Sequence, residues 1–153
     1  MSTPLIIRPA EGLTIPLGPS HLTIKLTSAQ TGGRLALLEY RVAPSFVPPT
    51  TPHGHTRESQ TVYIIEGSIR FEFEDQTVDL EAGSSLYIPE NCLFNWQNPR
   101  PSPARMLYVF APAGFEQFFV DVQQIYAKNP GVPPADISPL VKGLWAEYGI
   151  VSS

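Results

Sequence analysis

Two histidines separated by a single glycine are the residues of this chain whose types and spacing most directly indicate chemistry. His53 and His55 point to the same face if the segment is extended, because side chains alternate along a strand. Two imidazoles on one face can ligate a metal ion together, or act as general acid and base near neutral pH. The pair also fits two polar residues that end the proline-rich stretch 44–52.

Three further polar residues are candidates for the same site. The amide of Gln60 can donate to a carbonyl or enolate oxygen, so His53, His55 and Gln60 form the predicted catalytic group. Glu58 shares a strand face with Gln60 only if the chain is already extended there, and we do not expect it to be a ligand. His21 precedes an early strand, where we expect a surface or turn role.

Short strands and turns must position these residues. Hydrophobic residues make up 42% of the chain and charged residues 16%, with 17 prolines and 11 glycines, which favours an all-β fold. Turn residues at near-regular spacing separate extended segments, as a sandwich or barrel requires. We expect strands at residues 22–27, 34–42, 61–65, 69–74, 77–80, 86–88, 94–97 and 105–110.

The composition changes after residue 111. Apolar residues recur at helical spacing from Gly114 to Lys128, which predicts an amphipathic helix. A second helix is predicted from Pro139 to Tyr148, with Ser138 as its N-cap. We therefore divide the chain into a β-barrel over 1–111 and a helical extension over 112–153 that packs on the same domain.

Two groups of residues have a distinctive spacing. Four residues separate His55 from Gln60, and six separate Gln60 from Gly67. In the second group, the intervals from Gly83 through Pro89, Asn91 and Phe94 to Asn98 are five, one, two and three residues. The two groups lie within residues 53–98, with residues 68–82 between them.

In this spacing the chain resembles the small cupins, and its C-terminal segment resembles that of the quercetinase-like cupins. The resemblance implies an all-β jelly-roll barrel, the double-stranded β-helix, with two C-terminal helices, and often a homodimer. Cupins usually hold a metal with three histidines and one glutamate. Here Gln60 stands at the glutamate, Phe94 at the third histidine, Asn91 at a turn glycine and Val47 at the first glycine.

The two changed ligand positions alter the expected cofactor. A metal would keep the imidazoles of His53 and His55 and the neutral amide of Gln60, and would lose its anionic ligand. We therefore expect no cofactor. The alternative is one divalent transition metal (Fe, Mn, Ni, Cu or Zn) held by these three residues.

The aromatic residues near the motifs predict an apolar pocket. Phe71 and Phe73 share one strand face, and Phe94 and Trp96 share another, so we expect these four to bind the substrate. The alternative is that they fill a closed core.

The sequence leaves three functions open. The first is non-redox acid–base chemistry, such as isomerisation, cyclisation, dehydration or elimination, on an apolar metabolite. The others are a quercetinase-like dioxygenase and a non-catalytic binding protein.

Charge and composition exclude several partners. The net charge of −4 provides no basic surface for nucleic acid or an anionic membrane. The single cysteine, Cys92, excludes an intrachain disulfide. No apolar run is long enough to span a membrane, and we expect a cytoplasmic protein. An apolar small molecule and a second copy of the chain are the expected partners.

Overall fold

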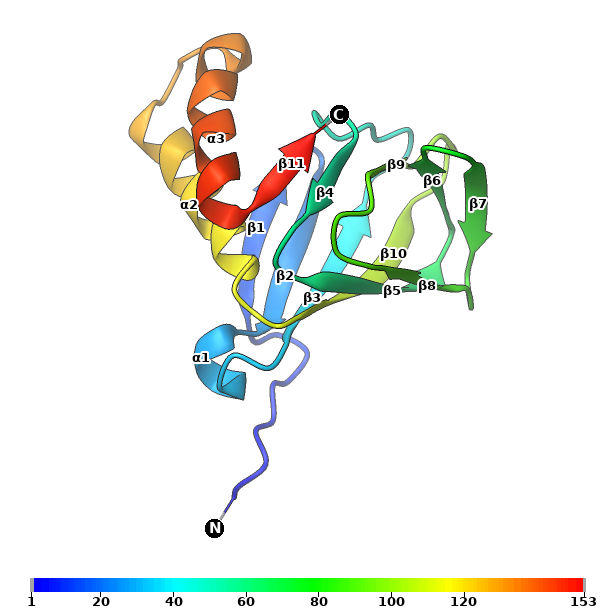
Figure 1. Cartoon of the computed structure of the whole chain (residues 1–153), viewed down its shortest axis with the longest axis vertical. Helices are drawn as coiled ribbons and strands as arrows, with labels where there is room; N and C mark the ends of the chain where they lie inside the picture. The colour runs from blue at the N-terminus through cyan, green and yellow to red at the C-terminus, as the bar shows by residue number, and fades with distance from the viewer. Residues whose placement is uncertain (1, 153) are drawn as a thin grey trace.

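Two antiparallel β-sheets face each other in the computed structural model, which describes residues 2–152 (Figure 1). The first sheet has the strand order β1-β2-β3-β10-β5-β8. Its strands are β1 (Leu13–Leu17), β2 (Ser20–Leu26), β3 (Ala36–Val42), β5 (Ser59–Glu66), β8 (Ser85–Ile88) and β10 (Ala104–Ala111). The second sheet has the order β11-β4-β9-β6-β7. It contains β4 (His53–His55), β6 (Ser68–Phe73), β7 (Thr77–Glu81), β9 (Phe94–Gln97) and β11 (Ile150–Ser152).

Three helices accompany the sheets: α1 (Ser28–Thr31), α2 (Glu116–Lys128) and α3 (Pro134–Tyr148). Helices α2 and α3 pack against each other and stand at one side of the sheets, beside β1 and β11 (Figure 1). This is the jelly-roll arrangement with two C-terminal helices that the sequence predicted. No helix among residues 2–152 is long and apolar enough to cross a membrane.

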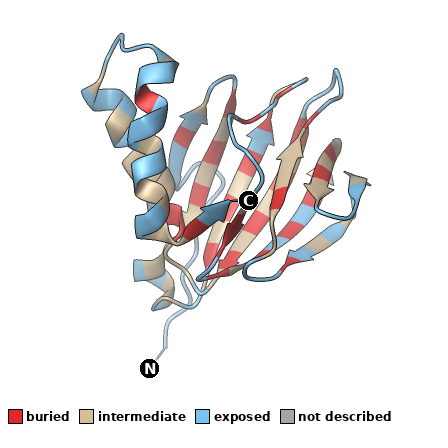
Figure 2. Cartoon of the chain, turned by 45° about the horizontal axis from the view of Figure 1, so that its top comes forward, coloured by how far each residue is buried: buried red, intermediate tan, exposed pale blue. Residues whose placement is uncertain are grey.

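The core lies between the sheets, where alternate residues of each strand point inward. Strand β10 is the clearest case: Ala104, Met106, Tyr108 and Phe110 are buried and the residues between them are only partly so. Figure 2 shows the same alternation as bands of buried and exposed residues along the strands. Such period-2 patterns are what made the strands predictable from the sequence.

All eight predicted strands are present within a residue or a few of their expected bounds, but four elements were not among those predicted. Strand β1 is paired along β2, the short helix α1 interrupts the β2–β3 connection, β4 lies between β9 and β11, and β11 follows α3. Each of the three added strands is very short or depends on a partner that is distant or weakly patterned. Local periodicity therefore did not reveal them.

The predicted start of the second C-terminal helix was wrong. Helix α3 begins at Pro134, so Ser138 is not its N-cap and Pro139 lies inside it. Proline is well suited to the first helical position, because its missing N–H has no partner there. Pro139 lacks the N–H that would bond four residues back, and the helix continues past it all the same.

Two positions of the predicted motifs have left-handed backbone. Gly67 has φ 76° between β5 and β6, and a Cβ there would lie 2.5 Å from the carbonyl oxygen of Pro103. Asn91 has φ 65°, and asparagine tolerates this region better than most residues. The exchange of a turn glycine for Asn91 is therefore compatible with the fold.

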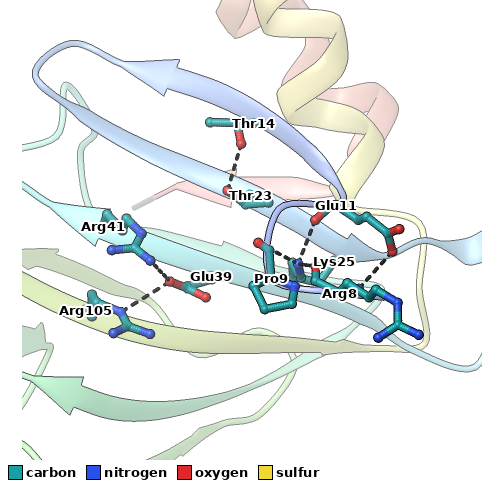
Figure 3. A network of polar contacts seen from close by, with 9 residues as sticks. All are labelled: Arg8, Pro9, Glu11, Thr14, Thr23, Lys25, Glu39, Arg41 and Arg105. Atoms are coloured by element: carbon teal, nitrogen blue, oxygen red, sulfur yellow. Dashed lines mark hydrogen bonds and ion pairs between the residues drawn. The ribbon is translucent and has the colours of Figure 1, made fainter. Parts of the chain in front are cut away.

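Polar contacts on the outer side of the first sheet connect its strands and the N-terminal segment (Figure 3). The ammonium of Lys25 on β2 donates to the carbonyl oxygens of Arg8 and Glu11 at 2.7 and 2.6 Å. The carboxylate of Glu39 lies 3.2 Å from the guanidinium groups of both Arg41 and Arg105. These contacts fasten the N-terminal segment to β2 and join β3 to β10.

Candidate active site

Strand β4 places both histidines. It is only three residues long, and it pairs with β9 on one side and β11 on the other. His53 is opposite Phe94, and His55 is opposite Ile150. The two imidazole rings lie on one face of the strand with their centroids 5.6 Å apart. The sequence prediction for the histidine pair agrees with this geometry.

His55 forms a buried pair with Glu58. Its Nδ1 lies 2.6 Å from Oε1 of the carboxylate, and the two side chains are only 3% and 5% exposed. An ionised carboxylate can only accept, so Nδ1 of His55 carries the proton in this contact. A carboxylate in this place orients the ring and stabilises the imidazolium that forms when Nε2 takes a second proton.

His53 has a different partner. Its Nδ1 lies 2.9 Å from the carbonyl oxygen of Thr51, which can only accept, so here Nε2 has the free lone pair. Burial lowers the pKa of His53, the bond to Thr51 opposes this shift, and His55 adds to it. His53 is therefore neutral at physiological pH, with a basic nitrogen available.

Gln60 and Phe94 occupy the two positions that depart from the cupin ligand set. Gln60 on β5 is 2% exposed and lies opposite Phe110. The ring of Phe94 is 4.9 Å from that of His53. An aromatic ring thus stands beside His53 where the family resemblance places a third imidazole.

An aromatic shell encloses His55. The ring of Phe115, from the segment before α2, makes an edge contact with the imidazole at 4.2 Å between centroids, and Phe110 stacks on it at 6.0 Å. Phe115 also contacts Phe118 on α2 and Tyr148 on α3. The segment before α2 and the two C-terminal helices therefore cover the imidazole of His55.

The four aromatic residues predicted to bind substrate do not share one cavity. Phe71 is fully buried in the core, where its ring stacks on that of Phe73. Phe94 is buried beside His53, and Trp96 is half-buried and meets Tyr40 of the opposite sheet edge-on. Phe73 is the one of the four that lines a described cavity.

Two cavities are described, and neither His53, His55 nor Gln60 lines them. The larger, of about 600 Å³, is lined by Phe73, the β6–β7 turn, Tyr87 and Cys92. The smaller, of about 290 Å³, is lined by Glu58, Phe115 and Tyr148, among others. We place the candidate site at the smaller cavity despite its size, because it reaches the buried Glu58 and the ring that covers His55.

The donor set does not match a cupin metal site. Within residues 2–152, no three His, Cys, Asp or Glu side chains are grouped so that they could hold a metal ion. The carboxylate of Glu58 is bonded to Nδ1 of His55, and Gln60 supplies only a neutral amide. His21, on β2, is not part of the site.

Sequence reasoning missed the contact of Glu58 with His55 and the position of Phe115. Glu58 was considered only as a metal ligand, whereas its three-residue spacing from His55 also allows a side-chain pair across a tight turn. Phe115 was assigned to a helix stripe, and no local pattern connects it to His55. Phe115 meets His55 only because the chain returns over the barrel.

Comparison with known proteins agrees with the fold. Residues 39–110 match the family model described as "Cupin domain". No curated protein matches the sequence.

Several solved structures are similar to the chain. KdgF from Halomonas sp. is 19% identical with a TM-score of 0.63, over 75% of this chain and 99% of that one. Pac13 from Streptomyces, a nucleoside dehydratase, is 19% identical with a TM-score of 0.59, over 75% of this chain and 88% of that one. A predicted oxalate decarboxylase from Thermotoga maritima is 15% identical with a TM-score of 0.62, over 71% of this chain and 99% of that one.

Proposed function

We propose that this chain, which contains a cupin domain, is an enzyme that moves a proton on an apolar small molecule without oxidising or reducing it. The observation that carries the proposal is the pair of His55 and Glu58, buried together at 2.6 Å beneath aromatic side chains. A histidine whose Nδ1 donates to a carboxylate can act as a general base, because the carboxylate stabilises the imidazolium that forms when Nε2 is protonated. Aromatic surroundings suit an apolar substrate.

In this proposal His55 takes the proton. Its Nε2 accepts a proton from the substrate, and the Glu58 carboxylate stabilises the resulting imidazolium through Nδ1. His53, whose pKa is lowered by burial, remains neutral and can accept or relay a proton at a neighbouring atom. Gln60 is the candidate donor for the oxygen on which negative charge develops.

The reaction class follows from these groups. Two bases near one substrate can remove a proton from one atom and return it to another, which is isomerisation. Removal of a proton next to a departing hydroxyl is dehydration, and ring closure can follow the same deprotonation. The name of one similar structure, a nucleoside dehydratase, supports chemistry of this kind.

The ligand set supports a reaction without a metal cofactor. A quercetinase-like dioxygenase needs an anionic ligand and a third imidazole, and Gln60 and Phe94 stand at those positions. The carboxylate of Glu58 already accepts a hydrogen bond from Nδ1 of His55. We therefore derive no step through a metal.

The test is the exchange of carbon-bound hydrogen for deuterium in D₂O with EDTA, followed by NMR. The first probe is 2-tetralone, an aromatic ketone with acidic hydrogens. Related ketones are then measured in the same way. We expect exchange faster than in buffer. His55→Gln should lower the protein-dependent rate by about 10²- to 10⁴-fold, the usual contribution of a general base. Glu58→Gln should lower it less, because the glutamine can still accept from Nδ1.

The control variant is Glu90→Gln, which removes an exposed carboxylate in the β8–β9 turn. It should leave the exchange rate unchanged. Ketones that bind without any exchange would contradict catalysis and favour the non-catalytic binding protein. Exchange that persists in His55→Gln would also contradict the proposal, since another group would then be the base.

A further inference from the structure

Two aromatic rings form walls of the smaller cavity, the one beside Glu58. The rings of Phe115 and Tyr148 meet edge-on at 6.2 Å between centroids, and both residues line the cavity together with residues 112–114. The volume of about 290 Å³ is near the lower end of the range for small-molecule sites, about 300–1,000 Å³. A compound of one or two rings therefore fits this cavity.

Glu58 is the buried charged residue of the cavity. It is 4% exposed, and its Oε1 lies 2.6 Å from Nδ1 of His55, which does not line the cavity. Because Oε1 faces His55, the second oxygen, Oε2, is the one that can meet a ligand. An ionised carboxylate can only accept hydrogen bonds. A polar ligand group that lies against Glu58 must therefore be a donor.

Donors of the cavity wall are already used within the protein. Three of them have partners outside the cavity: the hydroxyl of Tyr148 donates to Asp121, the backbone N–H of Gly114 to Glu116, and the backbone N–H of Ala113 to the carbonyl oxygen of Gly33. Burial and the bond to Asp121 raise the pKa of Tyr148, so its hydroxyl stays protonated and keeps this bond. These groups are not free to bind an acceptor on a ligand.

Two further charged residues of the cavity are exposed. Arg57 and Glu147 both line it, and Nη1 of Arg57 donates to the backbone carbonyl oxygen of Glu147 at 2.6 Å. Exposed charges contribute little to a contact, because water and salt screen them. The polar contact that discriminates between ligands is therefore the one with the buried Glu58.

We propose that the substrate carries a hydroxyl group on an apolar ring, and that this hydroxyl donates a hydrogen bond to Oε2 of Glu58. Oε1 of the same carboxylate holds His55, so Glu58 both orients the base and recognises the substrate. The inference rests on the proposed function for the presence of a substrate in this cavity. It narrows the substrate from apolar compounds in general to hydroxylated ones.

The test compares 6-hydroxy-2-tetralone with 6-fluoro-2-tetralone in a titration followed by NMR. Fluorine is close to a hydroxyl group in size but cannot donate a hydrogen bond. We expect the parent protein to bind the hydroxyl compound about ten- to a hundredfold more tightly, the range of one hydrogen bond to a charged group. Equal affinities in the parent protein would overturn the inference, and so would the failure of both compounds to bind.

The variant Glu58→Gln places a donor where Oε2 was. Its amide oxygen can still accept from Nδ1 of His55, so the amide nitrogen faces the ligand. The affinities for the two compounds should then differ by less than about threefold, while the fluoro compound binds as it does to the parent protein. An equal loss of affinity for both compounds would contradict the inference, since it indicates a packing defect.

The matched control is Glu147→Gln, which removes an exposed carboxylate of the same cavity. It should keep the full preference for the hydroxyl compound. A preference that is lost in Glu147→Gln and kept in Glu58→Gln would overturn the inference, because the exposed carboxylate would then be the acceptor.

Nuclear Overhauser contacts locate the ligand without any variant. The ring hydrogens of bound 6-hydroxy-2-tetralone should contact the rings of Phe115 and Tyr148. Contacts with Phe73 and Tyr87 in their place would put the ligand in the larger cavity and contradict the inference.

The hydrogen–deuterium exchange assay separates this inference from the proposed function. A preference for the hydroxyl compound that depends on Glu58, with no exchange in the parent protein, would support the Glu58 contact and contradict catalysis by His55. Exchange that requires His55, with equal affinities for the two compounds, would support the catalysis and contradict the contact.

Discussion

The two histidines of β4 differ in what holds their Nδ1 atoms. Nδ1 of His55 contacts the carboxylate of Glu58, and Nδ1 of His53 contacts the neutral carbonyl oxygen of Thr51. Both contacts orient the ring by accepting from Nδ1, but only the carboxylate can bring a full negative charge to its histidine. At the scale of single residues, the assignment of His55 as the base therefore follows from Glu58, three residues away.

The pKa of His53 predicts how stability depends on pH. Burial lowers this pKa from its ordinary value of 6.5, so below that value the unfolded chain binds more protons than the folded one. The free energy of unfolding should therefore be fully retained above about pH 6.5 and fall as the pH drops toward the folded pKa. In His53→Gln, the fall in melting temperature from about pH 7 to about pH 5 should be smaller than in the parent.

His21→Gln on β2 is the control for this prediction, since it removes a histidine outside the site. Both variants and the parent are compared by thermal unfolding in the same buffers. A pH dependence in His53→Gln as steep as that of the parent would show that other groups account for the loss of stability in acid.

At the scale of elements, the end of α3 holds the turn between His55 and Glu58. Gly149 caps the helix with φ 70°, and its carbonyl oxygen accepts from the backbone N–H of Thr56 at 2.9 Å and from the Thr56 hydroxyl at 2.8 Å. The guanidinium of Arg57 donates to the carbonyl oxygen of Glu147 at 2.6 Å. The last turn of the C-terminal extension thus supports the loop that brings Glu58 to His55.

Two glycines of α3 provide a matched pair of substitutions. In Gly149→Ala the new Cβ would lie 2.5 Å from Thr56 Oγ1, on a backbone with positive φ. We expect the free energy of unfolding to fall by about 1–3 kcal/mol, and the ketone exchange rate to fall with it. In Gly143→Ala nothing lies within 4 Å of the new Cβ. This variant should gain about 0.5–1 kcal/mol, since alanine favours the helix interior.

Urea denaturation measures both variants. Equal effects on stability would contradict a specific role for Gly149. A destabilised Gly149→Ala that keeps the full exchange rate of the folded protein would show that the turn between His55 and Glu58 does not need the end of α3.

At the scale of the whole molecule, the cupin barrel accommodates a site without the usual ligands. Elemental analysis of protein purified without chelators should find no stoichiometric Fe, Mn, Ni, Cu or Zn, because Gln60 and Phe94 replace an anionic and an imidazole ligand. The double variant Gln60→Glu with Phe94→His restores both ligand types on the same strands. It should retain a divalent metal that the parent does not. A stoichiometric metal in the parent would favour the dioxygenase.

Much of the fold was predictable because its signals are local. The alternation along β10, the turn at Gly67 and the pairing of two histidines on one face are set by residues within a strand or a turn. The same is true of Asn91, which adopts the positive φ that its position needs. The division of the chain at residue 111 and the homodimer remain predictions.

The sequence by itself determined the strand pattern, the paired histidines and the loss of two metal ligands, since each depends on residue type and short spacing. Only the tertiary structure decided what surrounds the histidines. The end of α3 holds the turn between His55 and Glu58, and Phe115 covers His55 because the chain returns over the barrel. These contacts of α3 and of Phe115 join residues far apart in the chain, and burial acts on them only when the whole core has formed.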